Sequence, residues 1–394
     1  MRFPEFTGEW KETNLSSYAK KITKKNKGNV ISNVLCNSAN LGIIPQSDYF
    51  DRDIANNENT DTYYVIENGD FVYNPRKSVT APYGPVNMYL GDKTGIISPL
   101  YLCFSVKDIC CDFLLHWFKG NAWHRYVYSH GDTGVRFDRV SIKDDTFLNM
   151  PIKVPVFEEQ IRISKLLRAI DERIATQNKI IEKYESLIQA MCDTLIERET
   201  QQVALSFSDF GQSYSGLSGK NAEDFGDGYP FITYMNVYQN QIIDSTDVGL
   251  VKIKETEQQS VVRYGDILFT LSSETPEEVG MGAVYLGETY PLYLNSFCFG
   301  IHITDEAKIY SPFLAYYVSS QSFRKAVYPL AQGSTRFNLQ KSDFMKKKFS
   351  FPMIEKQRKI YSILNTYSDK LIVEKQIIGL LCSQKRYLLR QLFI

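Results

Sequence analysis

The chain has 394 residues, enough for two or three domains with separate cores. Its 45 basic and 45 acidic residues balance, which argues against a generic nucleic-acid coat and against attraction to an anionic membrane. Seven cysteines without a CxxC pair or a zinc-like spacing to histidine indicate a reducing compartment. With no apolar signal core and no run of about 18 apolar residues, the sequence predicts a cytoplasmic protein with no membrane partner.

Two domains rich in short strands are predicted, over residues 1–157 and 201–354. In each, short apolar segments are bounded by turns and followed by a helix that would pack on the resulting sheet. The segments that favour strands lie at 72–73, 96–106, 229–232, 266–269 and 293–303. The segments that favour the covering helices lie at 113–117 and 313–318.

Each domain is followed by one long helix, predicted over 158–200 and 355–394. Both begin just after a proline and carry acidic residues in the first turn, as suits a helix N-terminus. At about 1.5 Å per residue, each helix would extend roughly 60 Å. That is long for a globular protein and favours a rod or spacer over a core element.

Both helices carry an apolar seam with alternating steps of three and four residues. The first seam consists of Leu167, Ile170, Ile174, Ile181, Tyr184, Ile188, Met191 and Leu195, with Gln177 in a polar slot. The second consists of Leu364, Tyr367, Leu371, Ile378, Leu381, Leu388 and Leu392, with Glu374 and Lys385 in polar slots. Adding 197 converts the first set into the second. Two such seams cannot stay exposed, so the helices are expected to pair with each other.

The repeat continues upstream, in segments where a heptad pattern cannot produce it. Pro155, Glu158 and Gln160 match Pro352, Glu355 and Gln357 at the same offset of 197. Further upstream the offset drifts only by loop-sized insertions: the matched pairs are Arg136 with Arg336 at 200, Cys103 with Cys298 at 195, and Gly91 with Gly287 and Asp70 with Asp266 at 196. The predicted fold is therefore α+β, with two tandem mixed α/β domains each followed by a long helix. The helices are expected to form an antiparallel coiled coil with pseudo-twofold symmetry.

These features together resemble the specificity subunit of type I DNA restriction-modification systems. The resemblance covers essentially the whole chain. It is carried by residues 2–10 and 69–75, by the matched segments 155–160 and 352–357, and by the heptad helix after each. It implies two target-recognition domains, each reading one half of a split DNA sequence, and a coiled coil that fixes the gap between the halves.

The resemblance also implies a subunit that is not itself an enzyme and holds no cofactor or metal. Its expected partners are double-stranded DNA, two copies of an adenine methyltransferase that uses S-adenosylmethionine, and restriction/translocase subunits that use ATP and magnesium. Spacer length would then be part of the specificity, as half-site spacing is for dimeric DNA binders.

The candidate DNA contacts lie in clusters of basic and polar residues. One cluster is a lysine run at 20–27, with no acidic residue between Glu12 and Asp48; another is the stretch 324–348, where seven basic residues from Arg324 onward face only Asp343. Such patches supply the salt-dependent part of DNA binding, and a solvated face is the alternative for each. The candidates are Lys20, Lys21, Lys24, Lys25, Lys27, Arg76, Lys77, Arg136, Ser334, Thr335, Arg336, Asn338, Lys341, Lys346 and Lys347.

Two glycine-bearing loops, 131–136 and 333–336, are predicted just before the strand that leads into each long helix. Their arginines either reach a guanine edge or a phosphate, or pair locally and serve the shared fold. Arg76 and Lys77 occupy in the first domain the region of Ser272, Ser273 and Glu274 in the second. If both loops face DNA, the two half-sites are read by different chemistry. A solvated loop is the alternative for the glutamate.

The four histidines show no metal or catalytic-triad pattern, and His116 and His124, which flank Trp117 and Trp123, are expected in packing. Cys103 and Cys298 lie in matched apolar runs and are expected to be small buried residues.

Two other classes of function stay open. A methyltransferase with its own recognition domain would need a Pro-Pro-aromatic element around the flipped base, and the sequence has no Pro-Pro pair, P-loop or GxGxxG motif. A coiled-coil scaffold with two protein-binding domains fits the neutral charge. Salt-dependent binding to a split DNA site would separate that scaffold from a DNA reader.

Overall fold

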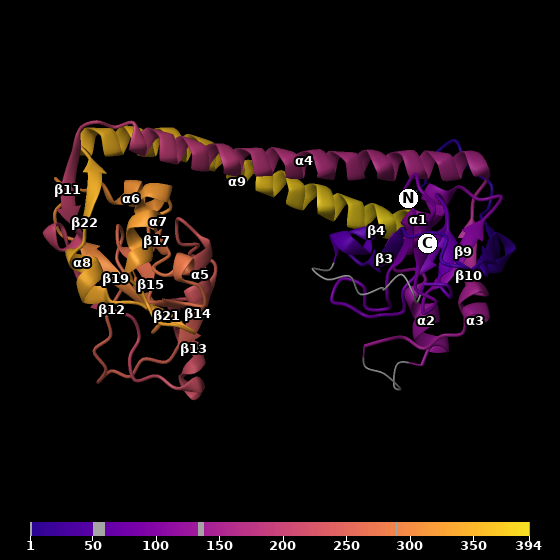
Figure 1. Ribbon diagram of the computed structural model, residues 1–394, viewed down its shortest axis with the longest axis horizontal. Coiled ribbons are helices and arrows are strands. Elements are labelled where there is room, and N and C mark those ends of the chain that lie inside the picture. Colours follow the sequence, from indigo (N-terminus) through magenta and orange to yellow (C-terminus); the bar gives the residue numbers. More distant parts are fainter. Residues whose placement is uncertain (1, 50–59, 133–137, 289, 394) are drawn as a thin grey trace. The chain divides into compact units, whose positions relative to one another are not determined.

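The computed structural model describes residues 2–49, 60–132, 138–288 and 290–393. The chain divides into two compact units: unit 1 is Met1–Asn178 with Gln376–Ile394, and unit 2 is Lys179–Lys375. The division passes through both long helices, α4 (Phe157–Glu197) and α9 (Ile354–Leu392), so each unit holds one part of each helix (Figure 1).

Unit 1 contains two four-stranded sheets. The first has the antiparallel order β2–β9–β6–β7; the second has the order β4–β3–β8–β5, in which β3 and β8 are parallel. A separate antiparallel pair, β1·β10, leads into α4. The strands are β1 (Lys11–Asn14), β2 (Ala19–Lys21), β3 (Val34–Ser38), β4 (Gly42–Pro45), β5 (Tyr64–Ile66), β6 (Phe71–Tyr73), β7 (Val86–Met88), β8 (Gly95–Ile97), β9 (Leu102–Val106) and β10 (Pro151–Val154). The helices are α1 (Cys111–Lys119), α2 (His124–His130) and α3 (Asp144–Leu148).

Unit 2 repeats this plan. Its main sheet has the order β12–β19–β15–β17, a second sheet has the order β14–β13–β18 with a parallel β13·β18 pair, and β11·β22 leads into α9. A third sheet has the order β16–β21–β20. The strands are β11 (Gln202–Ser206), β12 (Gly211–Ser215), β13 (Phe225–Ile232), β14 (Val248–Val251), β15 (Ile267–Thr270), β16 (Ser272–Ser273), β17 (Gly282–Val284), β18 (Tyr293–Leu294), β19 (Cys298–Ile303), β20 (Ala331–Gln332), β21 (Phe337–Leu339) and β22 (Lys348–Pro352). The helices are α5 (Tyr234–Gln239), α6 (Ser311–Tyr317), α7 (Gln321–Val327) and α8 (Lys341–Lys346).

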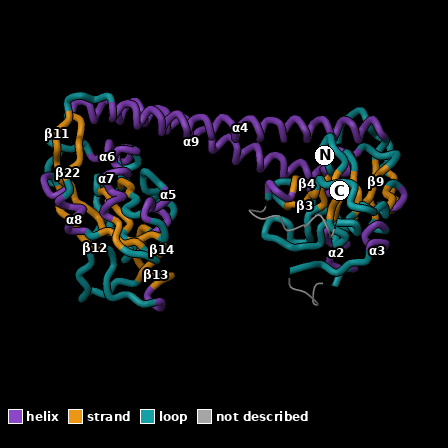
Figure 2. Tube along the Cα trace, in the orientation of Figure 1, coloured by secondary structure: helices purple, strands orange, loops and turns teal. Residues whose placement is uncertain are grey.

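The recurring strand order confirms the tandem repeat predicted from the sequence. The predicted covering helices are also present: α1 packs on β7 in unit 1, and α6 packs on β15 and β17 in unit 2. Figure 2 distinguishes the helices from the strands of each unit by colour. The predicted strands at 72–73 and 266–269 correspond to β6 and β15 at equivalent places of the two main sheets.

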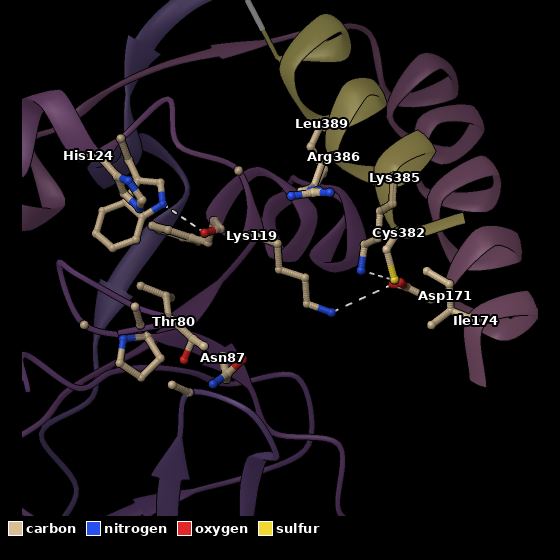
Figure 3. Close-up of a pocket in the computed structure, with 18 residues that line it drawn as sticks. Thr80, Asn87, Lys119, His124, Asp171, Ile174, Cys382, Lys385, Arg386 and Leu389 are labelled. Carbon is tan, nitrogen blue, oxygen red and sulfur yellow. Dashed lines mark hydrogen bonds and ion pairs between the residues drawn. The ribbon is translucent and has the colours of Figure 1, made fainter. Parts of the chain in front are cut away.

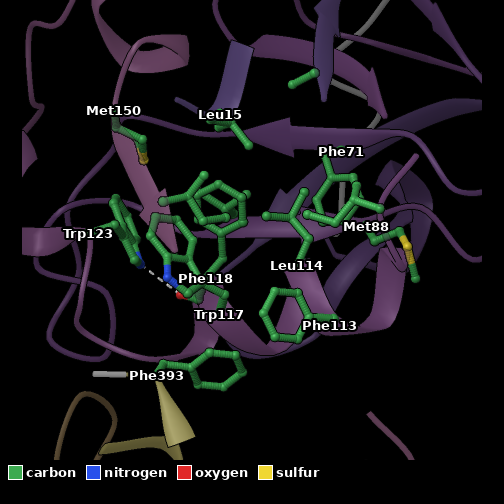
Figure 4. Packing of buried hydrophobic residues seen from close by; sticks show 14 of the residues in the cluster. Leu15, Phe71, Met88, Phe113, Leu114, Trp117, Phe118, Trp123, Met150 and Phe393 are labelled. Carbon is green, nitrogen blue, oxygen red and sulfur yellow. Dashed lines mark hydrogen bonds between the residues drawn. The ribbon is translucent and has the colours of Figure 1, made fainter. Parts of the chain in front are cut away.

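Aromatic side chains fill both cores, which explains much of the aromatic content. In unit 1 the ring of Phe71 stacks on Phe104 with centroids 5.4 Å apart, and Tyr73 stacks on Phe147 at 4.3 Å. Figure 4 shows Phe71, Phe113, Phe118 and Trp123 in this core. In unit 2 Phe207 stacks on Phe344 at 5.0 Å within a similar cluster. Offset and edge-to-face ring contacts of this kind add to the stability gained from burial alone.

Both long helices contribute to these cores. In unit 1 the beginning of α4 and the end of α9 pack into one cluster, through Ile163, Leu167, Leu388 and Leu392 among others. In unit 2 the end of α4 packs with the beginning of α9 in the same way. The predicted antiparallel pairing is therefore confirmed. The expectation of a rod rather than a core element is wrong at both ends. Ile163 and its repeat equivalent Ile360 extend the seam into the domain cores, and Cys192 and Ile196 widen the apolar face of α4 in unit 2.

Every residue of the predicted seams is buried or half-buried, the polar slots included. In unit 1 Lys385 forms an ion pair with Asp171 on α4, which lets a lysine occupy a seam position while its ammonium stays paired. In unit 2 Lys375 and Glu185 form an ion pair of 2.7 Å between α9 and α4.

A buried glutamine joins the first turn of each long helix to its domain. Gln160 accepts a hydrogen bond from the Cys110 backbone N–H at 2.8 Å and donates to the Pro155 carbonyl at 2.9 Å. Gln357 makes the equivalent bonds, from Tyr310 N–H and to the Pro352 carbonyl, both at 2.8 Å. The repeated proline-to-glutamine segments therefore encode one structural device, used twice.

Candidate nucleic-acid interface

In unit 2 the third sheet brings two candidate loops together. Strand β16, which is Ser272–Ser273, pairs with β21, and β21 pairs with β20. Asn338 on β21 stands opposite Ser272 on one side and opposite Gln332 on the other. We call this three-stranded sheet and its 333–336 turn the ribbon of unit 2. Its exposed polar residues are Gln332, Ser334, Thr335, Arg336 and Asn338.

The turn of this ribbon depends on glycine. Gly333 has φ of +136°, and a Cβ there would meet the Arg336 carbonyl oxygen at 2.1 Å, so a larger residue would force the turn open. The Arg336 guanidinium lies 5.8 Å from the ring centroid of Phe297, which is 55% exposed. A cation–π contact of this kind orients the arginine while leaving its N–H groups accessible.

Buried and half-buried polar side chains hold the ribbon of unit 2 in place by hydrogen bonds. Ser273 Oγ donates to Glu278 at 3.1 Å and Tyr238 Oη donates to the same carboxylate at 2.6 Å; the tyrosine bond is the main reason that the pKa of Glu278 is lowered. The Arg324 guanidinium donates to the carbonyls of Gly280, Glu277 and Val279 at 2.6, 2.7 and 2.7 Å. Burial lowers the pKa of Arg324. Arg324 therefore belongs to the framework, which corrects its assignment to the basic surface patch.

The other basic candidates of unit 2 lie around α8. Lys341 Nζ donates to Ser215 Oγ at 3.2 Å, Lys346 is exposed, and Lys347 is half-buried. The prediction that the arginine loop directly precedes the strand leading into the long helix is wrong, because β21 and α8 intervene before β22. Helix α8 buries only Phe344 and Met345, so its single turn gives too short an apolar pattern to be recognised in a lysine-rich sequence.

Unit 1 has the same arrangement at equivalent positions. Arg76, the repeat equivalent of Ser272, forms an antiparallel β-bridge with Arg139. Backbone hydrogen bonds from Lys77 N–H to the Asp138 carbonyl and from Val140 N–H to the Pro75 carbonyl, at 2.8 and 2.9 Å, extend this bridge. We call residues 75–77 with 138–140 the ribbon of unit 1. The candidate Arg136 lies outside the described residues.

The ribbon of unit 1 is positively charged. Asp138 lies 4.0 Å from the Arg76 guanidinium and 3.5 Å from that of Arg139, so two arginines share one carboxylate. Asn74 holds the loop in place: its Oδ1 accepts from Arg76 N–H at 3.0 Å and its amide donates to the Asn37 carbonyl at 3.0 Å. The Arg76 side chain is 68% exposed, and ion pairs this exposed contribute little to stability. Its guanidinium can therefore exchange the carboxylate for another acceptor.

The lysine run of unit 1 does not behave as one surface. Lys20, Lys24, Lys25 and Lys27 are exposed. Lys21 is half-buried and forms an ion pair of 2.6 Å with Asp144, and this hydrogen bond raises the pKa of Lys21. Lys21 is therefore better explained by packing of α3 against β2 than by a phosphate contact.

A cavity of about 480 Å³ in unit 1 adds further positive charge (Figure 3). Lys119 and Lys385 both form ion pairs with Asp171, the former at 3.9 Å. Arg386 is a third basic residue in the cavity lining. Burial, followed by the nearby Lys385, lowers the pKa of Lys119. The cavity lining therefore has more positive than negative charge in a chain with no net charge.

The buried titratable groups have structural partners or apolar surroundings. Tyr214 Oη donates to Asp266 at 2.7 Å, and His302 Nδ1 lies 2.8 Å from the other oxygen of that carboxylate. His116 is 4% exposed, as expected for packing. Cys103 and Cys298 are buried, which confirms their prediction. Among the described residues, no cluster of histidine, cysteine or acidic side chains is suited to a metal ion.

Three residues were missed from the sequence: Gln332 and Arg139, which belong to the ribbons, and Phe297, which contacts Arg336 of the ribbon of unit 2. Arg139 lies three residues after Arg136. The sequence repeat matched Arg136 to Arg336, whereas Arg139 is identified only by its β-bridge with Arg76. Strand pairing would have been needed to place Gln332 beside Asn338. Phe297, next to Cys298, reads as part of an apolar strand, and its exposure has no signal in the sequence.

Comparison with known proteins gives one family and one fold. Residues 209–381 match the family described as the type I restriction modification DNA specificity domain. A chain from a structure concerning complex assembly and conformational transition of the type I R-M system is 14% identical, with a TM-score of 0.60 over 98% of both chains. The S subunit of a type I restriction-modification system from M. genitalium is 15% identical, with a TM-score of 0.54 over 100% of this chain and 97% of that one.

At such low identity the solved structures establish the fold alone, and that fold extends over the whole chain. The protein is thus of the class in which two mixed α/β domains alternate with two long helices. Together with the family match over residues 209–381, this confirms the resemblance to the specificity subunit of type I restriction-modification systems. No helix in the described parts of the chain has the length and apolarity needed to span a membrane.

Proposed function

We propose that this chain is the DNA-recognition subunit of a type I restriction-modification complex and reads a split, asymmetric DNA site. Each unit reads one half-site through its ribbon, and the paired helices α4 and α9 set the gap. The observation that supports this most directly is that one strand pairing recurs in both units with different side chains. In unit 1 the exposed Arg76 faces the half-buried Arg139, and in unit 2 the buried Ser272 faces the exposed Asn338. A shared framework with divergent surfaces suits two unlike half-sites.

The chain itself is proposed to carry out no chemistry. Two adenine methyltransferase subunits would supply S-adenosylmethionine chemistry, and restriction/translocase subunits would supply ATP- and magnesium-dependent steps. The junctions between domain and long helix are built in the same way in the two halves of the chain, through Gln160 and Gln357, which suits recruitment of two copies of one partner.

Sequencing of methylated adenines in genomic DNA, from cells with and without this chain, tests the proposal. A split motif with a constant gap should appear only when the chain is present. A protein scaffold without DNA specificity would give no such motif, and the purified chain would then show no salt-dependent DNA binding.

The spacer role has a separate test. Removing one heptad from each helix, residues 177–183 and their repeat equivalent 374–380, keeps the seam in register and shortens the pair by about 10 Å. At 3.4 Å per base step, the gap should shorten by about three base pairs while both half-sites stay the same. An unchanged gap would reject the spacer model but not DNA recognition.

A further inference from the structure

We infer that the two ribbons select different bases at equivalent positions: Arg139 with Arg76 selects guanine in the half-site of unit 1, and Asn338 with Gln332 selects adenine in the half-site of unit 2. This inference rests on the proposed function and adds to it the residues that determine specificity and the bases they read.

The equivalence of the two positions comes from strand pairing. Arg139 stands opposite Arg76, and Asn338 stands opposite Ser272, which is the repeat equivalent of Arg76. Directly opposed residues of antiparallel strands project from the same face, with Cβ atoms about 4.5–5.5 Å apart. In each unit the central residue of the ribbon is therefore presented together with its cross-strand neighbour.

In unit 1 the opposed residues have the same charge, which destabilises a strand pair. Asp138 compensates only one of the two guanidinium groups, at 3.5 and 4.0 Å. A protein surface with an uncompensated guanidinium pair is stabilised when an acceptor-rich ligand binds. The guanine edge in the major groove offers two acceptors, O6 and N7, and the arginine fork matches them bidentately.

In unit 2 the residues at the equivalent strand positions are uncharged. Asn338 and Gln332 are directly opposed and both exposed, and Ser272 on the other side is small and buried. A carboxamide offers one donor and one acceptor, the pattern that matches N7 and N6 of adenine. A short β-ribbon fits into the major groove, where these edges are exposed.

The basic residues beside the ribbon have a different role. Lys346 is exposed at the end of α8, outside the ribbon. A lysine in such a place neutralises phosphates and contributes affinity that is independent of sequence. It therefore provides a matched control for the ribbon residues.

The experiment is selection of bound duplexes from a random-sequence DNA pool by the purified full-length chain. Asn338→Asp replaces the amide NH₂ with an acceptor, so an adenine in one half-site should be lost and cytosine favoured there, because a carboxylate accepts from the cytosine N4 amine. Arg139→Gln replaces the two-donor fork with one donor and one acceptor, so a guanine in the other half-site should lose its preference and adenine should be favoured there. Discrimination at the affected base pair should fall by about tenfold to a hundredfold.

The remaining half-site should be unchanged in each variant, which also reports that the variant is folded. Lys346→Gln should weaken binding to all sequences and reduce the salt dependence while leaving the motif intact. If wild-type protein selects a split motif and both ribbon variants select the same motif, the inference is overturned and the proposed function stands. If wild-type protein selects no motif and binds DNA without salt dependence, the proposed function itself fails.

Discussion

His116→Phe is expected to make the stability of unit 1 less sensitive to acid. The imidazole lies on α1 and is 4% exposed, and its Nδ1 has no hydrogen-bond partner among the described residues. Burial lowers the pKa of His116 to about 4; Lys119 and Lys385 act in the same direction, and Asp171 and Asp112 act against it. The ring is therefore neutral in the folded protein at neutral pH.

The sign of the effect follows from proton binding. Between the unfolded pKa of about 6.5 and the folded pKa of about 4, the unfolded chain binds more protons, so stability falls as the pH is lowered through this window. With about 1.4 kcal/mol for each pKa unit, His116 removes about 2 kcal/mol of stability between pH 7 and pH 5. For a unit of roughly 200 residues, that corresponds to a decrease in Tm of about 4–8 °C.

Tryptophan fluorescence is the assay, because Trp10, Trp117 and Trp123 all lie in unit 1 and are the chain's three tryptophans. The decrease in Tm from pH 7 to pH 5 should be smaller in His116→Phe than in wild type by about this amount. His130→Asn, at an exposed histidine of α2, is the matched control and should retain the wild-type decrease. Equal decreases in His116→Phe and wild type would refute the reasoning.

Two further predictions concern the helix junctions and the seam. Gln160→Leu leaves the Cys110 N–H and the Pro155 carbonyl without their hydrogen-bond partner. It should destabilise unit 1 by about 2–4 kcal/mol, as measured by tryptophan fluorescence. Gln357→Leu, the equivalent change in unit 2, should lower the fluorescence-detected Tm much less, and an equal decrease would show that the two junctions are not independent. Gln177→Leu replaces a buried polar seam residue and should raise the Tm of the helix pair, measured by circular dichroism, by the equivalent of about 1 kcal/mol while loosening its register; no increase would argue against its place in the seam.

The periodic features could be predicted from the sequence because they repeat locally. Heptad spacing gave the helices and their pairing, and the offset of 197 gave the tandem architecture. Both depend on which residue types recur at a given spacing, and such recurrence is visible without knowing the fold. The same offset located the glutamine junctions, although their hydrogen bonds became clear only once α1 and α6 were placed beside the long helices.

The candidate site was less predictable because it depends on strand register. Whether Asn338 faces Gln332 or lies one residue away is decided by turn geometry at Gly333, and a shift of one residue would reverse its face. Arg324 shows the same limit for charge. In the sequence it is one more basic residue in a patch, but in the structure three backbone carbonyls bind it.

The residues that the two repeats share can be separated from those that differ by what each contacts. Asp70 accepts a hydrogen bond from Glu67 N–H at 2.7 Å, and its equivalent Asp266 accepts one from Arg263 N–H at 2.8 Å, so both close the same turn. The matched tyrosine–glycine pairs have a similar role: a Cβ at Gly91 or Gly287 would meet the hydroxyl of the tyrosine two residues earlier, at 2.3 and 2.6 Å.

The two pairs Asp70 with Asp266 and Gly91 with Gly287 are thus explained by the framework that both units share. The residues at positions 76 and 139 differ in charge from those at 272 and 338, although the strand pairing around them is the same. Folding constrains the framework residues in both units alike, whereas an exposed side chain on a common backbone is free to vary with what it binds. The change from arginines to neutral polar side chains at one fixed place is therefore what the proposed function expects of two ribbons that read different half-sites.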